Sequence, residues 1–250
     1  MAKQNGIIPL VGTIGGINFY YLNGKPVARA AGGGFNGDAI RTKKSMERVR
    51  ENGREFGHCS RVNKAFRQSL RPFYNNYRFP FFHSRLMTLF TQLKGLDAIN
   101  TRGERCVANG LTTDLGKRLL ADFNYTPDCT VQQVLPFTYT MDWASYTLTL
   151  PEFDIKLVPF VSGATHIALQ FGVLDFHFET LDSALHLASP LVLAKDFAGA
   201  SLGFTPVTAP TGLGLQLAVM GVRYYQEVDG LLYVLNAREG VGISVFSIKN

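Results

Sequence analysis

The hydrophobic pattern of this chain changes its period near Tyr125. Between residues 44 and 122, apolar side chains recur every three or four positions, which is the period of an amphipathic helix. After Tyr125 they alternate with polar side chains, and glycine and proline punctuate the alternating stretches. The change predicts an α+β fold in which a helical segment is followed by a C-terminal antiparallel β-sandwich.

The first forty residues have the pattern of a β-hairpin. Residues 17–22 alternate, Asn23-Gly24 can supply the positive φ angles of a type I′ turn, and residues 25–30 return. Pro26 in the returning strand indicates an edge position, and the glycines at 32–34 indicate a flexible loop. We therefore expect three parts: a hairpin arm with a glycine-rich loop over 1–40, a basic helical segment over 41–125 and the sandwich over 126–250.

Within these parts the caps and turn residues predict individual elements. Ser45 is expected to begin a helix that ends near Arg54, because Asn52-Gly53 is a poor helix interior. Ser60 is expected to cap the next helix. Two further helices and eight strands are predicted: Phe81–Leu96, Asp114–Phe123, Tyr146–Leu150, Asp154–Val158, Thr165–Phe178, Ser189–Leu193, Ala200–Thr205, Leu213–Tyr225, Leu231–Leu235 and Val241–Ile248.

Charge is divided unequally between the two halves of the chain. Residues 1–120 hold 20 Lys and Arg against 7 Asp and Glu, a balance of +13, whereas residues 121–250 hold 5 against 12, a balance of −7. Such asymmetry suggests an ionic partner. Charged residues make up only 18% of the chain, so apolar surface is hidden either in a large β core or in a permanent subunit interface.

Signals for catalysis, cofactors and metals are weak. The chain has neither a phosphate-binding G-x-x-x-x-G-K-[ST] motif nor a G-x-S-x-G nucleophile motif. Asp175, His177 and Glu179 alternate on a predicted strand, and a solvated face explains this row better than a metal site. We therefore predict no enzyme, with no catalytic residue, cofactor or metal.

The cysteine and hydropathy patterns bear on location. Cys59, Cys106 and Cys129 fit no zinc spacing and cannot all pair, so free thiols in a reducing compartment are expected. The most apolar stretch, residues 212–222, is shorter than the roughly 20 residues that a membrane span needs. A cytoplasmic protein with no membrane span is predicted.

The basic helix faces and the hairpin are the candidate interaction residues. Arginine predominates on these faces, which favours bidentate contacts with carboxylate or phosphate, but three interpretations stay open: a solvated face, a contact with acidic protein surface, and a contact with the phosphate backbone of nucleic acid. The predicted interface residues are Ile17, Phe19, Tyr21, Arg50, Arg54, Arg61, Lys64, Arg67 and Arg71.

Three blocks of the sequence stand out: residues 12–20 (GTIGGINFY), 48–57 (RVRENGREFG) and 221–230 (GVRYYQEVDG). Together they resemble a family of conserved hypothetical proteins of Bacteroidetes-type bacteria. The resemblance spans both ends of the chain and the helical block. It implies one full-length protein of that family, but it implies no activity and no site residue.

These observations predict a structural protein that assembles with itself. An apolar hairpin is marginally stable alone and needs a further sheet or groove; if a neighbouring copy provides it, arm exchange and head-to-tail contacts between basic and acidic halves give a filament, tube or ring. The alternative partner is nucleic acid, in a coat or packaging protein with a basic inner face. An arm that folds back on its own sandwich is the simpler alternative to arm exchange, and an enzyme with an unrecognised site is the third interpretation.

Overall fold

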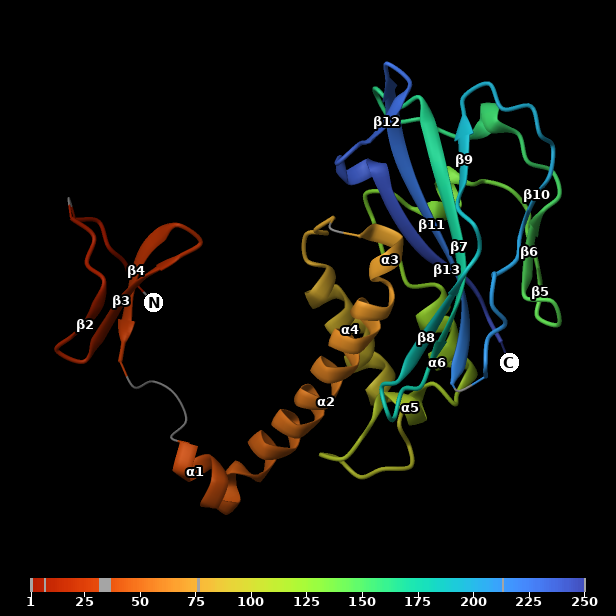
Figure 1. The fold of residues 1–250 in the computed structure, drawn as a ribbon. Coiled ribbons are helices and arrows are strands. Elements are labelled where there is room, and N and C mark those ends of the chain that lie inside the picture. Colours follow the sequence, from red (N-terminus) through yellow and green to blue (C-terminus); the bar gives the residue numbers. More distant parts are fainter. Residues whose placement is uncertain (1, 7, 32–36, 76, 213, 250) are drawn as a thin grey trace. The chain divides into compact units, whose positions relative to one another are not determined.

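The structure is a computed structural model that describes residues 2–6, 8–31, 37–75, 77–212 and 214–249 (Figure 1). The chain divides into two compact units, Met1–Arg50 and Glu51–Asn250. N-terminal strands and helices precede large antiparallel sheets, so the predicted α+β class is confirmed.

The first unit is built on a four-stranded antiparallel sheet in the order β1-β4-β3-β2. The strands are β1 (Ala2–Lys3), β2 (Gly12–Ile14), β3 (Ile17–Leu22) and β4 (Lys25–Ala30), and they are followed by helix α1 (Gly37–Thr42) and the 3-10 turn η1 (Lys44–Met46). Asn23 and Gly24 have φ angles of 51° and 75°, as a type I′ turn requires.

Two expectations about this unit need correction. The hairpin is not two-stranded, since β1 and β2 extend it on both sides. Pro26 is not at an edge either, because β4 lies between β1 and β3 and the Pro26 carbonyl accepts a hydrogen bond from Gln4 N at 3.1 Å. The Gly32–Gly34 loop lies outside the described residues.

The second unit begins within a long helix. Helix α2 (Glu47–Ser69) runs without a break through Asn52-Gly53 and Ser60, so the predicted stop and cap are wrong. Its inward residues Glu55, Cys59, Val62 and Phe66 form one stripe across the predicted break. The free energy gained by burying the apolar side chains of this stripe outweighs the roughly 1 kcal/mol that a glycine costs inside a helix. The other helices are α3 (Arg71–Tyr74), α4 (Phe82–Gly95), α5 (Val107–Gly110), α6 (Asp114–Ala121) and α7 (Val131–Val134).

Two antiparallel sheets form the rest of this unit. The larger has six strands: β7 (His166–Phe176), β8 (Ser183–Leu187), β9 (Leu191–Ala194), β11 (Leu215–Val228), β12 (Leu231–Val234) and β13 (Val241–Ile248). The smaller contains β5 (Thr140–Asp142), β6 (Thr147–Leu150) and β10 (Leu202–Phe204).

Residues 154–158, predicted as a strand, instead contain a 3-10 turn, η2 (Ile155–Leu157), because the Asp154 carboxylate accepts a hydrogen bond from Lys156 N. A last 3-10 turn, η3 (Arg238–Gly240), precedes β13.

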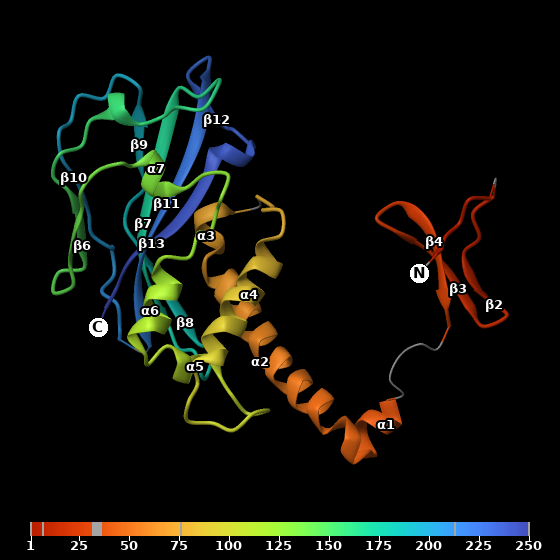
Figure 2. The same ribbon diagram turned by 180° about the vertical axis from the view of Figure 1, so that it is seen from behind.

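The six-stranded sheet is the middle layer of the second unit (Figures 1 and 2). One face packs against the smaller sheet, where Leu148, Phe171 and Met220 belong to one core. The other face packs against α2 and α4, where Phe66, Phe90 and Leu174 belong to a second core. The helical residues after Glu51 and the sandwich therefore share one unit, whereas the sequence pattern separates them at residue 125.

None of the helices within the described ranges is long and apolar enough to cross a membrane.

Candidate interaction surface

The N-terminal sheet has one apolar face and one basic face. In the strand register Phe19 lies opposite Gly12 and Ala28, so these residues share a face. The same alternation assigns the other members of the apolar face, which are Ile14, Ile17, Tyr21, Pro26 and Ala30. Lys3, Lys25 and Arg29 belong to the opposite face. The three hydrophobic residues predicted as interface therefore lie side by side on an uncharged surface.

Little covers this apolar face. Ile14, Ile17 and Tyr21 expose 59%, 42% and 50% of their surfaces. Among the described residues up to Arg50, Val27 is the one buried side chain, and it lies on the basic face beside Tyr20. A sheet of one layer is stable only when its hydrophobic face packs against a second layer, and the described residues of the first unit do not provide that layer.

The net charge also differs between the two structural units. Residues 1–50 contain 8 Lys and Arg against 2 Asp and Glu, which gives +6; the remaining residues contain 25 − 8 = 17 against 19 − 2 = 17, which gives zero. The entire formal excess of the chain therefore belongs to the first unit. Part of it lies on the sheet, where the Arg29 guanidinium is 5.6 Å from the centre of the Tyr20 ring.

Three of the predicted basic residues make contacts within the chain. Arg50 Nη1 donates to the carbonyls of Ile40 and Lys43 at 2.6 and 2.9 Å. Arg54 Nε donates to Gly103 O at 3.2 Å and lies 3.1 Å from the Glu104 carboxylate. Arg67 Nε donates to Asn63 Oδ1 at 2.8 Å. These contacts help to fix the local fold and reduce what the three side chains can offer to a partner.

The other three basic residues are exposed. Arg61 and Lys64 lie on the outer side of α2, and within the described part of the chain neither makes a hydrogen bond or an ion pair through its side chain. Arg71 is exposed at the start of α3. Arg61 and Lys64 are therefore the members of the predicted stripe that remain available for an acidic or phosphate-bearing partner.

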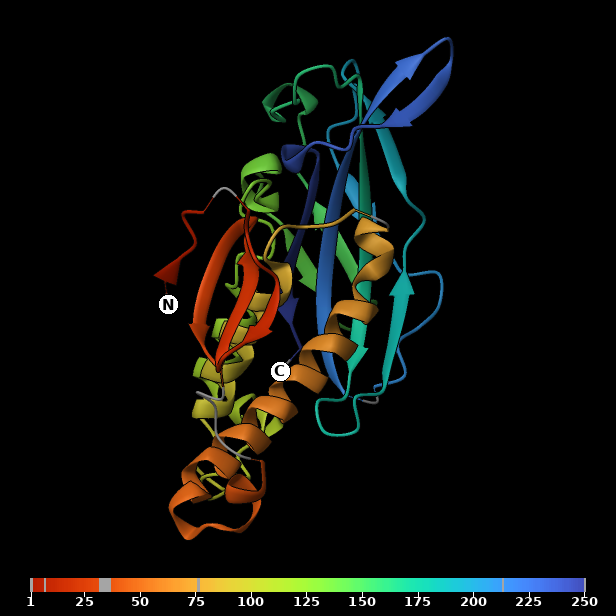
Figure 3. The same ribbon diagram turned by 90° about the vertical axis from the view of Figure 1, so that its left-hand side faces the viewer.

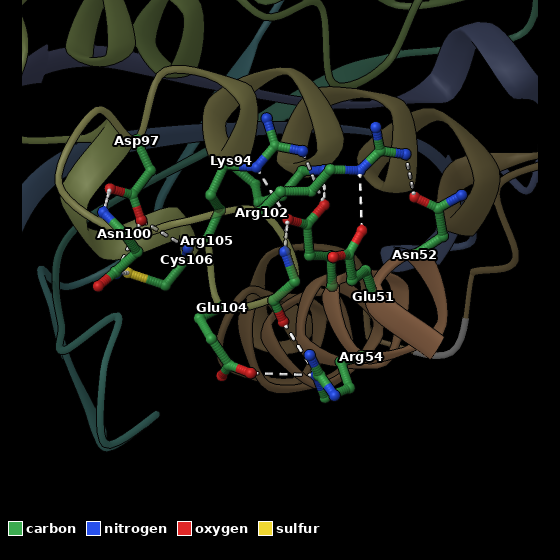
Figure 4. A network of polar contacts seen from close by, with 12 residues as sticks. Glu51, Asn52, Arg54, Lys94, Asp97, Asn100, Arg102, Glu104, Arg105 and Cys106 are labelled. Atoms are coloured by element: carbon green, nitrogen blue, oxygen red, sulfur yellow. Dashed lines mark hydrogen bonds and ion pairs between the residues drawn. The ribbon is translucent and has the colours of Figure 1, made fainter. Parts of the chain in front are cut away.

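A buried ion cluster on α2, absent from the sequence interpretation, explains how the long α4–α5 loop is held (Figure 4). The Glu55 side chain is 3% exposed and accepts hydrogen bonds from Lys94 Nζ at 2.6 Å, from Arg105 at 2.8 and 2.9 Å and from Gly103 N at 2.8 Å. Helical spacing could suggest only pairs within α2. The real partners are 39 to 50 residues away in sequence.

This environment keeps Glu55 ionised. The hydrogen bonds from Arg105 lower the pKa of the carboxyl; burial opposes them, and Lys94 and the Gly103 amide lower it further, to about 2. A paired, fully bonded carboxylate of this kind serves to fix the loop to α2.

A second carboxylate, Asp97, organises the loop itself. It accepts hydrogen bonds from the backbone amides of Ile99, Asn100 and Cys106 at 2.8 to 3.0 Å. Burial raises the pKa of Asp97, but these amide donors lower it more, so the net shift is downward. Asp97 and Glu55 together therefore hold the conformation of the α4–α5 loop and fix it to α2.

The described residues contain no group of three or more side chains that could hold a metal ion. Asp175 was expected on a solvated row, but it is buried and accepts a hydrogen bond from Gly214 N at 2.6 Å, because the strand it belongs to has packed layers on both faces. Burial raises the pKa of the thiols of Cys59, Cys106 and Cys129, the last to about 12, which disfavours the nucleophilic thiolate.

The β11–β12 hairpin is an exposed apolar surface of the second unit. Leu231 and Tyr233 expose 61% and 54% of their surfaces, and β12 pairs only with β11 among the described strands. The hairpin, in blue, projects from one end of the sheet in Figure 3. Its turn residues Asp229 and Gly230 have φ angles of 52° and 78°, as a type I′ turn requires. Glu227 and Asp229 make this tip acidic.

Comparisons of the chain with protein-family models, with curated proteins and with solved structures found no match.

Proposed function

We propose that this protein is a structural subunit that assembles with copies of itself through its N-terminal sheet. The observation that carries the proposal is the uncovered apolar face of that sheet, around Ile17, Phe19 and Tyr21. Roughly 25 cal/mol is gained for each Å² of apolar surface removed from water, so a second layer supplied by another molecule would stabilise both partners. No catalytic step is part of the proposal.

The β11–β12 hairpin of a second copy has the properties of an acceptor for this sheet. It exposes apolar side chains, its β12 edge can accept a further strand, and Glu227 and Asp229 complement the +6 charge of the first unit. Because donor and acceptor lie on different surfaces, the contact is heterologous. Repeated contacts of this type close into a ring or continue as a filament or tube.

Size-exclusion chromatography with light scattering tests the assembly. The unmodified chain is expected to elute as large particles, and Ile17→Ser together with Tyr21→Ser is expected to give smaller species. Ile99→Ser is the matched control, because Ile99 is 75% exposed and lies in the α4–α5 loop of the second unit. A hairpin variant, Leu231→Ser with Tyr233→Ser, tests the acceptor separately. Particles unaffected by the sheet variants would contradict the proposal.

A coat or packaging protein for nucleic acid is the second candidate. The basic face of the sheet and the unpartnered Arg61 and Lys64 favour it. This function predicts purified particles with a raised 260/280 nm absorbance ratio that fall apart steeply as salt increases. Self-assembly through an apolar face predicts particles that need no nucleic acid and survive moderate salt.

We also propose a cytoplasmic location. All three cysteines are free thiols, and two of them, Cys59 and Cys129, are buried. Free thiols are typical of a reducing compartment. Quantitative thiol labelling of the denatured protein isolated from its native cells would test this, with three reactive thiols expected.

A further inference from the structure

The helices cover only part of their face of the six-stranded sheet. On β7, Leu174 and Phe176 are fully buried beneath the helices. His166, Ala168 and Gln170 belong to the same face by strand alternation, yet they are only partly buried. The alternate residues of this half, such as Ile167 and Leu169, stay buried in the other core. One half of the helix-side face is therefore open.

Arg223 lies at the border of this open half. It pairs in register with Ala168 of β7 and Val241 of β13, so its side chain is on the helix-side face. Two residues earlier, Gly221 lies directly under the Phe73 ring of α3, where an added Cβ would be 2.8 Å from the ring. The helical cover ends with α3, and the arginine follows it at once.

The Arg223 guanidinium lacks a partner in the described chain. Its Nε is inaccessible to solvent and has no hydrogen-bond acceptor, and no carboxylate of the described residues lies within 4.0 Å of the side chain. Glu227, the carboxylate further along β11, lies 3.7 Å from His166 instead. Arg223 as a whole is half-buried, but its Nε is a buried donor without an acceptor, and a hydrogen bond left unmade at a buried donor is destabilising.

A pocket of about 80 Å³ lies beside this side chain. Its lining includes Arg223, Tyr225, Asn75, Gln170, Pro72 and Pro190. The Tyr225 hydroxyl and the Asn75 amide also make no hydrogen bond through their side chains within the described chain. One water needs roughly 10–15 Å³ measured in this way, so the pocket has room for several waters or one small oxyanion.

The backbone at the pocket is strained. Asn75 ends α3 with a φ of 49° and a ψ of −117°, outside the regions that an ordinary L-residue prefers. Strain of this kind costs on the order of 1–3 kcal/mol and concentrates where chains hold ligands. It places an amide side chain beside an unpaired guanidinium.

We propose that Arg223 is the anchor of a binding site for a small oxyanion, a phosphate or a carboxylate, with Tyr225 and Asn75 as additional donors. A guanidinium gives paired N–H donors in the planar arrangement that both ligands accept. The site belongs to the second unit alone. It is therefore independent of the assembly through the N-terminal sheet.

Isothermal titration of the full chain tests the site. Inorganic phosphate and acetate are titrated separately, at constant ionic strength in chloride. We expect binding of at least one of them; binding of phosphate alone or of acetate alone would identify the ligand class. Arg223→Lys keeps the charge but loses the planar donor pair and should bind about tenfold more weakly. Arg118→Gln, which removes an exposed cation on α6 of the same unit, is the matched control and should bind as the unmodified chain does.

Two further variants keep the test decisive. Arg223→Met should abolish binding; if it does not fold, Tyr225→Phe, which removes only a hydroxyl, should still weaken binding by several-fold. The proposal is overturned if neither anion binds, or if the Arg118 and Arg223 variants lose affinity equally, since that would indicate general attraction to a basic surface.

Discussion

The two units of this protein bury their apolar side chains to very different extents. Glu51–Asn250 places a six-stranded sheet between helices and a smaller sheet, has two cores and carries no net charge. Met1–Arg50 has a sheet of one layer, one buried side chain among its described residues and a charge of +6. The Glu51–Asn250 unit buries its apolar side chains within itself, whereas the Met1–Arg50 unit leaves the apolar face of its sheet exposed within the unit.

Removing the N-terminal sheet is the change with the largest expected effect. Deletion of residues 2–30 should convert large particles into single chains while the second unit keeps its unfolding temperature, because its two cores contain none of the deleted residues. Light scattering and calorimetry measure the two effects. A fall in the unfolding temperature with no change in particle mass would show that the sheet packs on its own chain.

A phenylalanine in each unit allows a matched comparison. Phe66 lies at the centre of the second core, with ring centroids 5.4 to 6.4 Å from Phe90, Tyr125 and Phe176. Phe66→Ala should lower the free energy of unfolding by about 4 kcal/mol. Phe19→Ala should change it by less than about 0.5 kcal/mol in the dilute single chain but should weaken assembly. Denaturant titration of both variants checks this, and equal losses would contradict the contrast between the units.

The buried ion cluster gives a smaller contrast within the second unit. Glu55→Ala should cost about 3 kcal/mol, because Arg105 and Lys94 would lose a buried counter-ion. Glu104→Ala removes an exposed pair with Arg54 and should cost less than about 1 kcal/mol. Urea unfolding of the two variants measures both values. Similar losses would mean that the cluster does not hold the loop.

Lowering the pH should remove the stabilisation that the same ion cluster gives to the folded state. The pKa of Glu55 falls from 4.5 to about 2 on folding, so the folded state binds fewer protons than the unfolded state in this range. The stabilisation by Glu55 is complete above pH 4.5 and is lost as the pH falls towards 2. Glu55→Gln should flatten this part of the stability profile. An unchanged slope would assign the acid sensitivity to other carboxylates, such as Asp97.

The sequence predicted the local features of the fold better than the tertiary ones. Asn23-Gly24 forms the expected turn because the positive φ angles are a local requirement that these two residue types meet. Asn52-Gly53 does not end α2, because packing of the helix outweighs the local preference. Strands β5 and β8 were missed, since they are short or irregular in pattern and depend on pairing with β6 and β7.

The candidate surfaces, too, were predicted only where a local pattern determines them. Alternation correctly placed Ile17, Phe19 and Tyr21 on one face. The partners of Arg54 and Glu55 lie in the α4–α5 loop, about fifty residues away, and no local spacing shows them. Arg223 is one arginine in an apolar strand, and its sequence neighbours do not show that its Nε finds no acceptor among the residues that the structure describes.

The central claim is that another copy of the chain covers the apolar face of the N-terminal sheet. Chemical crosslinking between isotopically light and heavy chains tests this claim most directly. Light and ¹⁵N-labelled chains are mixed in equal amounts, allowed to exchange and joined by a zero-length reagent that links lysine to carboxylate. We expect links from Lys25 to Glu227 or Asp229, about half of them between a light and a heavy chain, as random mixing of two copies requires. Links only within chains of one isotope would show that the sheet packs on its own body and would contradict the account.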